Sequence, residues 1–241
     1  KRAQEGPIYA PTLALRELHP EYADRIPSVA EQFTPDNHHD MVRFEIMKQF
    51  GYFVTESSEH SSEYYPWFIK KDHPELIDRF HIPLDEYPRR CRDQIARWKQ
   101  QAEHLVHNEN LTHTRSSEYA AGIIEALETG RTFGFAGNVL NTGLIDNLPF
   151  DACVEVSCMV NEGHLSPCHM GPLPNQLAAL NRRQIEVHQL TVDAALTRKK
   201  EYIYQAAMLD PHAGSELTID EIRSLVDDLI QAHGDWLPEY H

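Results

Sequence analysis

Apolar side chains recur at helical spacing near the start of the main part of the chain. In the run DMVRFEIMKQFG, one side of a helix would carry Met41, Phe44, Met47 and Phe50. Asp40 precedes the run as a residue that can cap a helix, and Gly51 follows it as a residue that can end one. The pattern predicts a helix between Asp40 and Gly51.

Four further segments carry helical patterns, and they run over 88–108, 116–130, 175–208 and 217–234. The first is amphipathic, and its apolar side is formed by Cys91, Ile95, Trp98, Ala102 and Leu105. The third is the longest and contains neither Gly nor Pro. The last begins with the capping box Thr218-x-x-Glu221 and ends at Gly234.

The pattern changes to alternation in the middle of the chain. The runs RTFGFAGNVLNTG and DACVEVSCMV are rich in β-branched and aromatic residues and predict strands. In the second run, Val154, Val156 and Cys158 would face one way, and Glu155 and Ser157 the other. No internal repeat is present, and the elements together predict a helix-dominated α+β fold with a small sheet.

Length and charge exclude two classes of function. With 241 residues, 41% of them hydrophobic, the chain can bury a core as one large domain or as one domain with an appendage. Its net charge of −15 comes from 37 acidic and 22 basic residues, and such a surface repels the phosphates of nucleic acid. No apolar run approaches the ~18 residues of a membrane span, so we expect neither a nucleic-acid nor a membrane partner.

The first residues, KRAQEGPIYAP, have neither a signal-peptide layout nor an initiating Met, so we expect the sequence to begin inside a longer protein. Residues 1–35 are predicted to form an irregular entry segment with one short helix near Thr12–Glu17, and residues 36–241 to form the main domain. No C-x-x-C pair occurs among the four cysteines, which indicates reduced thiols in a cytoplasmic protein.

The stretch TESSEHSSEYYPWF carries the first candidate chemistry. A phenol with a pKa near 10 is a weak base at neutral pH unless a cation, a metal or a cofactor stabilises its phenolate. If the stretch is helical, His60 and Tyr64 share one face, whereas Glu59 and Glu63 share another, and Pro66 limits how far the helix can run. The alternative is an amphipathic turn whose rings pack and whose acids face water, and composition alone favours it.

Two other clusters have a plain structural explanation beside the functional one. In GHLSPCHMG, the residues His164, Cys168 and His169 are metal-ligating types, but their spacing matches no zinc pattern and the last two are adjacent. The pair Arg89 and Arg90 could bind a carboxylate or a phosphate, although a solvated pair at a helix start is the favoured interpretation.

The loop sequence NVLNTGLIDNLPFDACVEV offers amides to a polar ligand. Its candidates are Asn138, Asn141 and Asn147, with Gly137 and Gly143 exposing backbone groups. Asn and Gly are also ordinary turn residues, and the two interpretations are compatible.

Two long segments of the chain match the pattern of one known family. They are MVRFEIMKQFGYFVTESSEHSSEYYPWFIK and NTGLIDNLPFDACVEVSCMVNEGHLSPCHMGPLPNQLAALNRRQIEVHQLTVDAAL. The second holds the pattern N-x-G-x-I-x-N-L-P-x-D-x-x-V-E-V and, downstream, G-x-x-x-x-x-x-x-G-x-L-P. From about Thr34 onward the chain closely resembles the family-four glycoside hydrolases and, within them, the alpha-galactosidases of the melibiase type.

This resemblance implies a fold similar to lactate and malate dehydrogenases, with an N-terminal Rossmann domain that holds NAD and a C-terminal domain with a small mixed sheet. It also implies an unusual glycosidase mechanism with a divalent metal, usually Mn²⁺. The sugar C3 hydroxyl is oxidised by NAD, a tyrosine removes the acidified C2 proton, the C1–O bond breaks, water adds, and the ketone is reduced again.

The resemblance places this chain in the C-terminal, substrate-binding and dimerising half of such an enzyme. In the family, the Gly-rich NAD turn and the Cys-His and Asn-His metal motifs lie in the N-terminal half, so we expect the main NAD and Mn²⁺ ligands outside this chain and no turnover by the chain alone. Cys168 and His169 are not expected to be the metal pair, because they lie far downstream of it.

The family's base tyrosine falls at Tyr64 or Tyr65, and the pair Glu63-Tyr64 favours Tyr64 with Tyr65 in reserve. Further substrate-binding positions implied by the resemblance are His60, Glu59, Asn138 and Asn141.

The implied function is hydrolysis of alpha-galactosides by a cytoplasmic homo-oligomer, a dimer or a tetramer. Within the family, an alpha-galacturonidase or an alpha-glucosidase is the alternative, whereas the acidic balance argues against a phosphorylated sugar. Outside this activity, the alternatives are a non-catalytic sugar-binding or interaction module and a metal-dependent hydrolase that uses Cys168 and His169.

Overall fold

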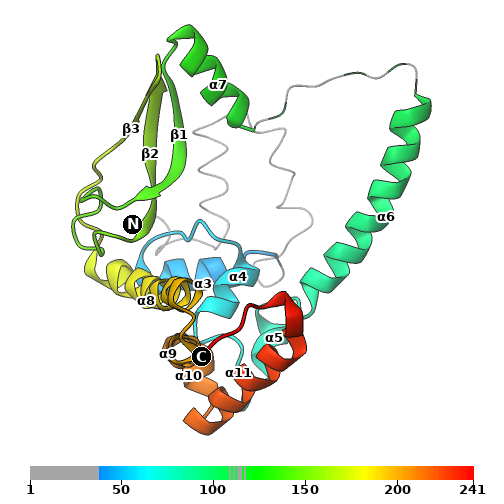
Figure 1. The fold of residues 1–241 in the computed structure, drawn as a ribbon, viewed down its shortest axis with the longest axis vertical. Coiled ribbons are helices and arrows are strands. Elements are labelled where there is room, and N and C mark those ends of the chain that lie inside the picture. The colour runs from blue at the N-terminus through cyan, green and yellow to red at the C-terminus, as the bar shows by residue number, and fades with distance from the viewer. Residues whose placement is uncertain (1–37, 109, 111, 113–115, 117) are drawn as a thin grey trace. The chain divides into compact units, whose positions relative to one another are not determined.

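The computed structural model describes residues 38–108, 110, 112, 116 and 118–241. The predicted entry segment 1–35 lies outside these residues. Chain contacts define two compact units, one that joins the residues up to Pro83 with Ala179–His241 and one that spans Leu84–Ala178. The helix-rich α+β class is confirmed (Figure 1), while the boundary of a single domain 36–241 stays a prediction.

The described part of the first unit is built from helices. They are α3 (Met41–Phe50), α4 (Ser58–Tyr64), α5 (Glu75–Arg79), most of α8 (Asn175–Thr197), α9 (Lys200–Leu209), α10 (Ala213–Glu216), α11 (Ile219–His233) and the 3-10 helix η3 (Gly234–Trp236). Across the described ranges, no helix combines the length and the apolarity that a membrane span needs.

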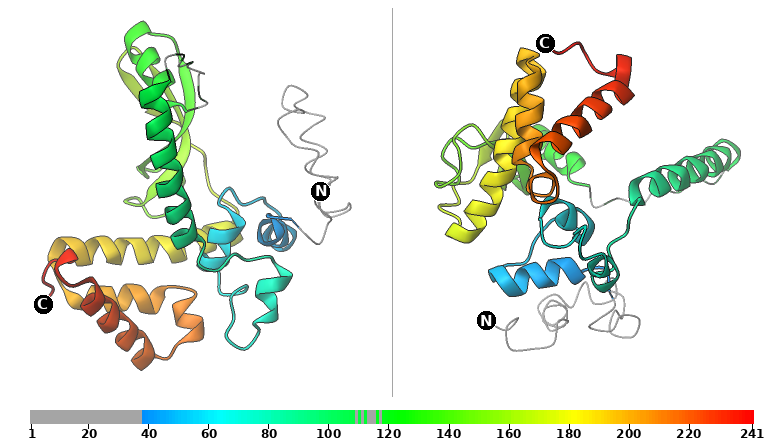
Figure 2. Two further views of the ribbon diagram at one scale, coloured as in Figure 1. Left: turned by 90° about the vertical axis from the view of Figure 1, so that its right-hand side faces the viewer. Right: turned by 90° about the horizontal axis from the view of Figure 1, so that it is seen from below.

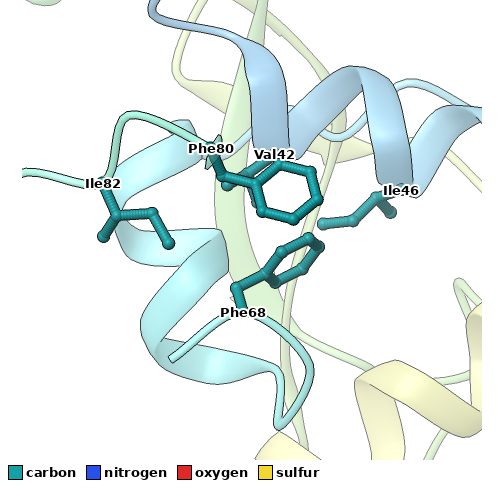
Figure 3. Close-up of a cluster of buried hydrophobic side chains, with 5 residues drawn as sticks. All are labelled: Val42, Ile46, Phe68, Phe80 and Ile82. Carbon is teal, nitrogen blue, oxygen red and sulfur yellow. The ribbon is translucent and has the colours of Figure 1, made fainter. Parts of the chain in front are cut away.

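A small hydrophobic core holds α3 against the segment that follows α4 (Figure 3). Its buried members are Val42, Ile46, Phe68, Phe80 and Ile82. The rings of Phe68 and Phe80 meet edge to face with centroids 5.1 Å apart, which is a favourable arrangement for aromatic pairs. The core therefore fixes both ends of the stretch that contains α4.

The predicted apolar stripe of α3 is right only in part, because Met41 and Phe50 pack against the core but are only partly buried. The residues that α3 buries are Val42 and Ile46, one turn apart, because the rings of the segment after α4 cover that face. Gly51 ends the helix in the left-handed conformation with φ of 83°, as predicted. Asp40 precedes the helix, but its side chain makes no capping bond and instead pairs with Arg43.

The predicted long helix over 175–208 is interrupted. Arg198 adopts a left-handed φ of 62° between α8 and α9, which turns the chain so that α9 packs against α11 (Figure 2). Across that contact, the Tyr204 hydroxyl donates to Asp227 at 2.5 Å. The capping box of Thr218 and Glu221 at the start of α11 is confirmed.

The second unit contains α6 (Glu86–His107), α7 (Ala120–Thr129) and the strands β1 (Phe133–Leu140), β2 (Cys153–Asn161) and β3 (His164–Pro167). The strands pair in the order β1-β2-β3, and both pairings are antiparallel, whereas a mixed sheet was expected. The alternation along β2 is confirmed, with Val154, Val156 and Cys158 buried. Helix α7 approaches β1 closely at Gly122, where a Cβ would lie 2.6 Å from the ring of Phe133.

Helix α6 forms as predicted but buries none of its side chains within the described part of the chain. On its predicted packing side, Ile95 is 59% exposed and Trp98 is 61% exposed. The amphipathic pattern therefore predicted the helix correctly, but its apolar side is not buried within this unit.

An ion pair closes the first unit around α10. The Lys70 ammonium pairs with the Glu216 carboxylate, which also accepts a hydrogen bond from the backbone N–H of Lys71 at 2.9 Å. These two donors, with the Lys70 hydrogen bond the larger cause, lower the pKa of Glu216 from 4.5 to about 2.

We expect Glu216→Gln to change the acid limb of the stability curve. A carboxyl whose pKa is lower in the folded state stabilises the fold above its unfolded pKa of 4.5, and that contribution is lost as the pH falls toward about 2. The variant should be less stable than the parent at pH 7, and the difference should shrink between pH 5 and pH 2. Urea unfolding across this range measures it. Glu201→Gln, at an exposed residue of α9, is the control, and an equal effect of both substitutions would contradict the prediction.

Candidate functional site

The segment with the candidate tyrosines forms the short helix α4 and then leaves it abruptly. Ser57 caps the start, where its side chain accepts a hydrogen bond from the N–H of His60 at 3.2 Å. The helix ends at Tyr64 because a residue before proline avoids the helical conformation, and Tyr65 is extended with φ of −109° and ψ of 139° ahead of Pro66. The stretch is therefore helical only up to Tyr64, in agreement with the limit expected from Pro66.

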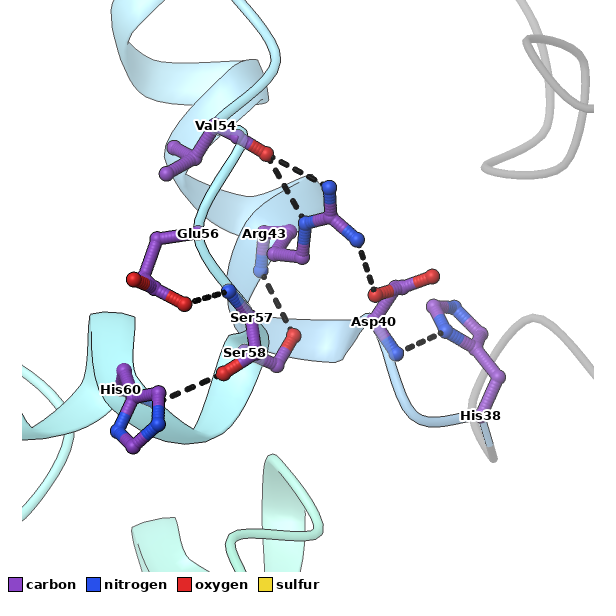
Figure 4. Close-up of polar contacts among 8 residues, drawn as sticks. All are labelled: His38, Asp40, Arg43, Val54, Glu56, Ser57, Ser58 and His60. Atoms are coloured by element: carbon purple, nitrogen blue, oxygen red, sulfur yellow. Dashed lines mark hydrogen bonds and ion pairs between the residues drawn. The ribbon is translucent and has the colours of Figure 1, made fainter. Parts of the chain in front are cut away.

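Arg43 of α3 anchors the loop that leads into α4 (Figure 4). Its guanidinium donates to the Val54 carbonyl through Nε at 3.0 Å and Nη2 at 2.8 Å, and to Asp40 through Nη1 at 3.0 Å. Its backbone N–H donates to the Ser58 hydroxyl oxygen at 3.2 Å, and its side chain lies 4.1 Å from the centroid of Phe53. One arginine thus fixes the loop, the first residue of α4 and an aromatic ring.

The exposed face of α4 groups His60, Glu63 and Tyr64. The rings of His60 and Tyr64 are stacked with centroids 6.2 Å apart, as their spacing of four predicted. Glu63, which was expected on another face, bonds His60 Nδ1 at 3.0 Å. This hydrogen bond is the main cause of a raised His60 pKa, so the imidazole is more readily protonated than a free one. Glu59 lies half-buried on the same helix.

Tyr64 ends α4 with 42% of its surface exposed. Partial burial raises the pKa of its phenol, and the carboxylates of Glu56 and Glu63 raise it further. The phenol is consequently protonated at neutral pH in this environment. To act as a base, it needs a cation beyond the groups that the described chain places around it.

Tyr65 has a different environment from its neighbour. Its ring stacks on Trp67 with centroids 5.2 Å apart and packs against the core of the first unit, and this burial raises its pKa. Of the two adjacent tyrosines, one is presented to solvent beside His60 and the other is part of the packing.

The two asparagines expected to contact substrate have unlike positions in the second unit. Asn138 lies on the exposed side of β1, opposite Glu155 on β2. Asn141 is 0% exposed; its Nδ2 donates to the carbonyls of Ile145, Leu148 and Pro149, and its Oδ1 accepts from the Ile145 N–H at 2.9 Å. Asn141 therefore stabilises the turn from within, and contact with a sugar would require that turn to open.

The other candidate clusters of this unit make hydrogen bonds to other segments of the same unit. Asn147 bonds both backbone groups of Leu173, at 2.8 and 2.9 Å. His169 Nε2 bonds Asp146 at 2.7 Å, whereas His164 Nδ1 contacts the carbonyl of Glu162. Cys168 donates its N–H to Ser157 and so continues the sheet edge. The structure does not bring His164, Cys168 and His169 together as one donor set.

Two residues that sequence reasoning passed over prove central to α4. Arg43 lies in the quoted α3 run, but apart from Asp40 its partners are a backbone carbonyl and a hydroxyl oxygen, which no sequence pattern indicates. Gln184 of α8 donates to the carbonyl of Tyr64 at 3.1 Å, from 120 positions further along the chain. No local sequence pattern indicates a contact over this distance in the chain.

Comparison with known proteins identifies the family. Residues 13–213 match the model described as the family 4 glycosyl hydrolase C-terminal domain. The chain belongs to the family 4 glycosyl hydrolases. This family 4 domain is 57% identical over 224 residues to the alpha-galactosidase of Bacillus subtilis (strain 168), which covers 93% of this chain and 51% of that protein. It is 32% identical over 212 residues to the alpha-galactosidase of Rhizobium meliloti (strain 1021), covering 83% and 43%.

The fold of the family 4 domain also has a solved counterpart. A 6-phospho-alpha-glucosidase from gut microorganisms, in complex with NAD and Mn²⁺, superposes with a TM-score of 0.57 at 21% identity, over 83% of this chain and 44% of that one. The chain thus spans about half the length of the relatives that it matches.

The described residues of the family 4 domain do not fit either cofactor by themselves. They contain no group of three or more His, Cys, Asp or Glu side chains that could hold a metal ion. The full sequence has no G-x-G-x-x-G turn for the pyrophosphate of a dinucleotide. The chemistry of these groups is therefore not assigned to residues of this chain.

Adjacent buried serines of α4 give opposite predictions for alanine substitution. Ser61 is 1% exposed, and its hydroxyl has no hydrogen-bond partner within the described chain; Ser62 is 0% exposed and donates to the Glu59 carbonyl at 2.6 Å. Ser61→Ala removes an unpaired buried hydroxyl and should raise the free energy of unfolding by about 1 kcal/mol, whereas Ser62→Ala should lower it by about 1 kcal/mol. Denaturant unfolding measures the free energy of unfolding of both variants. A less stable Ser61→Ala together with a more stable Ser62→Ala would contradict the prediction.

Proposed function

We propose that this chain is the C-terminal part of an NAD- and Mn²⁺-dependent alpha-galactosidase in which Tyr64 removes the C2 proton of the sugar. The family match and the 57% identity to a Bacillus subtilis alpha-galactosidase support the activity. The observation that carries the assignment of the base is the contrast between exposed Tyr64, beside His60, and packed Tyr65.

The reaction proposed for the complete protein is oxidation, elimination, addition of water and reduction, as the family resemblance implies. When bound in the complete protein, NAD would supply hydride exchange at C3 and Mn²⁺ would supply Lewis acidity. Within this scheme, the Tyr64 phenolate accepts the C2 proton, the C2–H electron pair forms the C1–C2 double bond, and the C1–O pair leaves with the aglycone.

The charges and burial around Tyr64 are suited to a base that works only when the rest of the active site is present. Partial burial, and to a smaller degree the carboxylates of Glu56 and Glu63, raise the pKa of the Tyr64 phenol, so proton removal requires a cation supplied from elsewhere. We therefore expect no hydrolysis of a nitrophenyl alpha-galactoside by this chain on its own. The alternative of a sugar-binding module predicts instead that galactose binds to the chain without either cofactor.

The same carboxylates favour a neutral sugar. Glu56, Glu59 and Glu63 lie within eight positions around Tyr64. Three carboxylates there repel the acid group of a galacturonide and the phosphate of a phosphorylated sugar more than a galactoside. We propose that His60 and Glu59 bind the sugar beside Tyr64.

We expect Tyr64→Phe in the complete enzyme to lower kcat for an alpha-galactoside by about 10²- to 10⁴-fold, the usual contribution of a general base. The substitution removes one hydroxyl and keeps the ring that stacks on His60. Steady-state hydrolysis of nitrophenyl alpha-galactoside measures it, alongside the matching galacturonide and alpha-glucoside.

Tyr65→Phe is the matched control, and it should retain most of the parent's kcat because the packing of the ring is kept. An active Tyr64→Phe with an inactive Tyr65→Phe would move the base to Tyr65. A preference for the galacturonide would overturn the proposed substrate.

A further inference from the structure

We propose that Gln184 of α8 is a positioning residue that sets the orientation of Tyr64. This inference rests on the proposed role of Tyr64 as the base. The Gln184 side chain donates from Nε2 to the backbone carbonyl of Tyr64 at 3.1 Å, and both residues belong to the first unit. Gln184 touches neither the phenol nor, in this proposal, the sugar; it acts through the backbone that carries the phenol.

The end of α4 needs such a partner. The last carbonyls of any helix receive no hydrogen bond from an N–H within that helix. Tyr64 is the last residue of α4, so its carbonyl needs a donor from elsewhere. The N–H of Tyr65, which follows the helix, donates to the Ser61 carbonyl at 3.2 Å and so leaves the Tyr64 carbonyl to another donor. Pro66 has no N–H to give. The amide of Gln184 supplies the donor that the local sequence lacks.

The buried side of α4 cannot replace this hydrogen bond by packing. Its buried residues are Ser58, Ser61 and Ser62, so a helix of 7 residues enters the unit without one buried apolar side chain. Helices this short are unstable alone and normally depend on an apolar face. Helix α4 depends instead on discrete polar contacts at its two ends.

The two ends are held from different helices. At the start, Ser57 caps α4 itself, and the bond from the Arg43 N–H to the Ser58 hydroxyl fixes α4 to α3. At the end, Gln184 fixes Tyr64 to α8. The pair of Lys70 with Glu216 acts six residues after Tyr64 and secures the following segment to α10. Loss of Gln184 should therefore loosen the tyrosine end of α4 while the rest of the unit stays folded.

The test replaces Gln184 in the complete enzyme that contains this chain. Gln184→Met keeps the length of the side chain and removes the donor, and kcat should fall about 5- to 30-fold with KM changed less than about 2-fold, because a small misplacement of a reacting group slows the step more than binding. The isotope effect with substrate deuterated at C2 should rise, since proton removal becomes slower. Amide hydrogen exchange over residues 58–68 should become faster.

Three matched variants separate positioning from general stability. Gln184→Lys restores a donor and should recover most of the lost kcat, whereas Gln184→Glu, which has the same length and no donor at neutral pH, should not. Gln205→Met makes the same replacement at an exposed position of α9 and should leave kcat, the isotope effect and the exchange unchanged.

The outcomes distinguish this inference from the proposed function. If Tyr64→Phe is inactive but Gln184→Met keeps the parent's kcat, isotope effect and exchange, the positioning role is wrong and the base assignment stands. If Tyr64→Phe is active, the base assignment fails, and the exchange over residues 58–68 alone decides whether Gln184 holds α4. If Gln184→Met unfolds the enzyme and Gln184→Lys does not restore kcat, Gln184 is structural and the proposal is overturned.

Discussion

The bond from Arg43 to the carbonyl of Val54 is the interaction on which the candidate site depends. Helix α4 has serines where a short helix usually has apolar side chains, so hydrophobic burial does not locate it. Arg43 instead belongs to α3, which the buried core holds in place. Three of its N–H groups donate hydrogen bonds, two to the loop before α4 and one to Asp40. A bidentate contact from a planar, permanently charged group fixes both distance and direction, and the Ser57 cap and Ser58 then start the helix in a defined place.

This construction separates stability from chemistry. The core of Phe68, Phe80 and the α3 residues stabilises the unit. Polar contacts set the position of α4, so that His60, Glu63 and Tyr64 lie on its outer face. The environment of Tyr64 is poor for an isolated base, since burial and two carboxylates raise the pKa of its phenol. Such a residue is suited to a site that becomes reactive only when other groups of the enzyme bring positive charge to it.

Elements with strong periodic or capping signals could be predicted from the sequence: the alternation of β2, the capping box of α11, and the glycine that ends α3. The buried face of α3 could not, because Met41 and Phe44 are as apolar as Val42 and Ile46, and only the tertiary contact with Phe68 decides between them. The break at Arg198 was equally hidden, since no Gly or Pro marks it.

The candidate site could be predicted in part. The family pattern indicated the two tyrosines, and the i, i+4 spacing indicated that His60 and Tyr64 share a face of the helix. The burial of Asn141 could not be predicted, because a buried turn amide and an exposed one have the same sequence signature.

The central claim is that Tyr64, and not Tyr65, takes the C2 proton. Its most direct measurement is exchange of that proton with solvent: the complete enzyme, supplied with its cofactors, is incubated with an alpha-galactoside in D₂O, and deuterium at C2 is followed by NMR. The account predicts that Tyr64→Phe exchanges at least about 100-fold more slowly than the parent, and that Tyr65→Phe exchanges at a rate close to the parent's. Exchange by Tyr64→Phe at the parent's rate would contradict it.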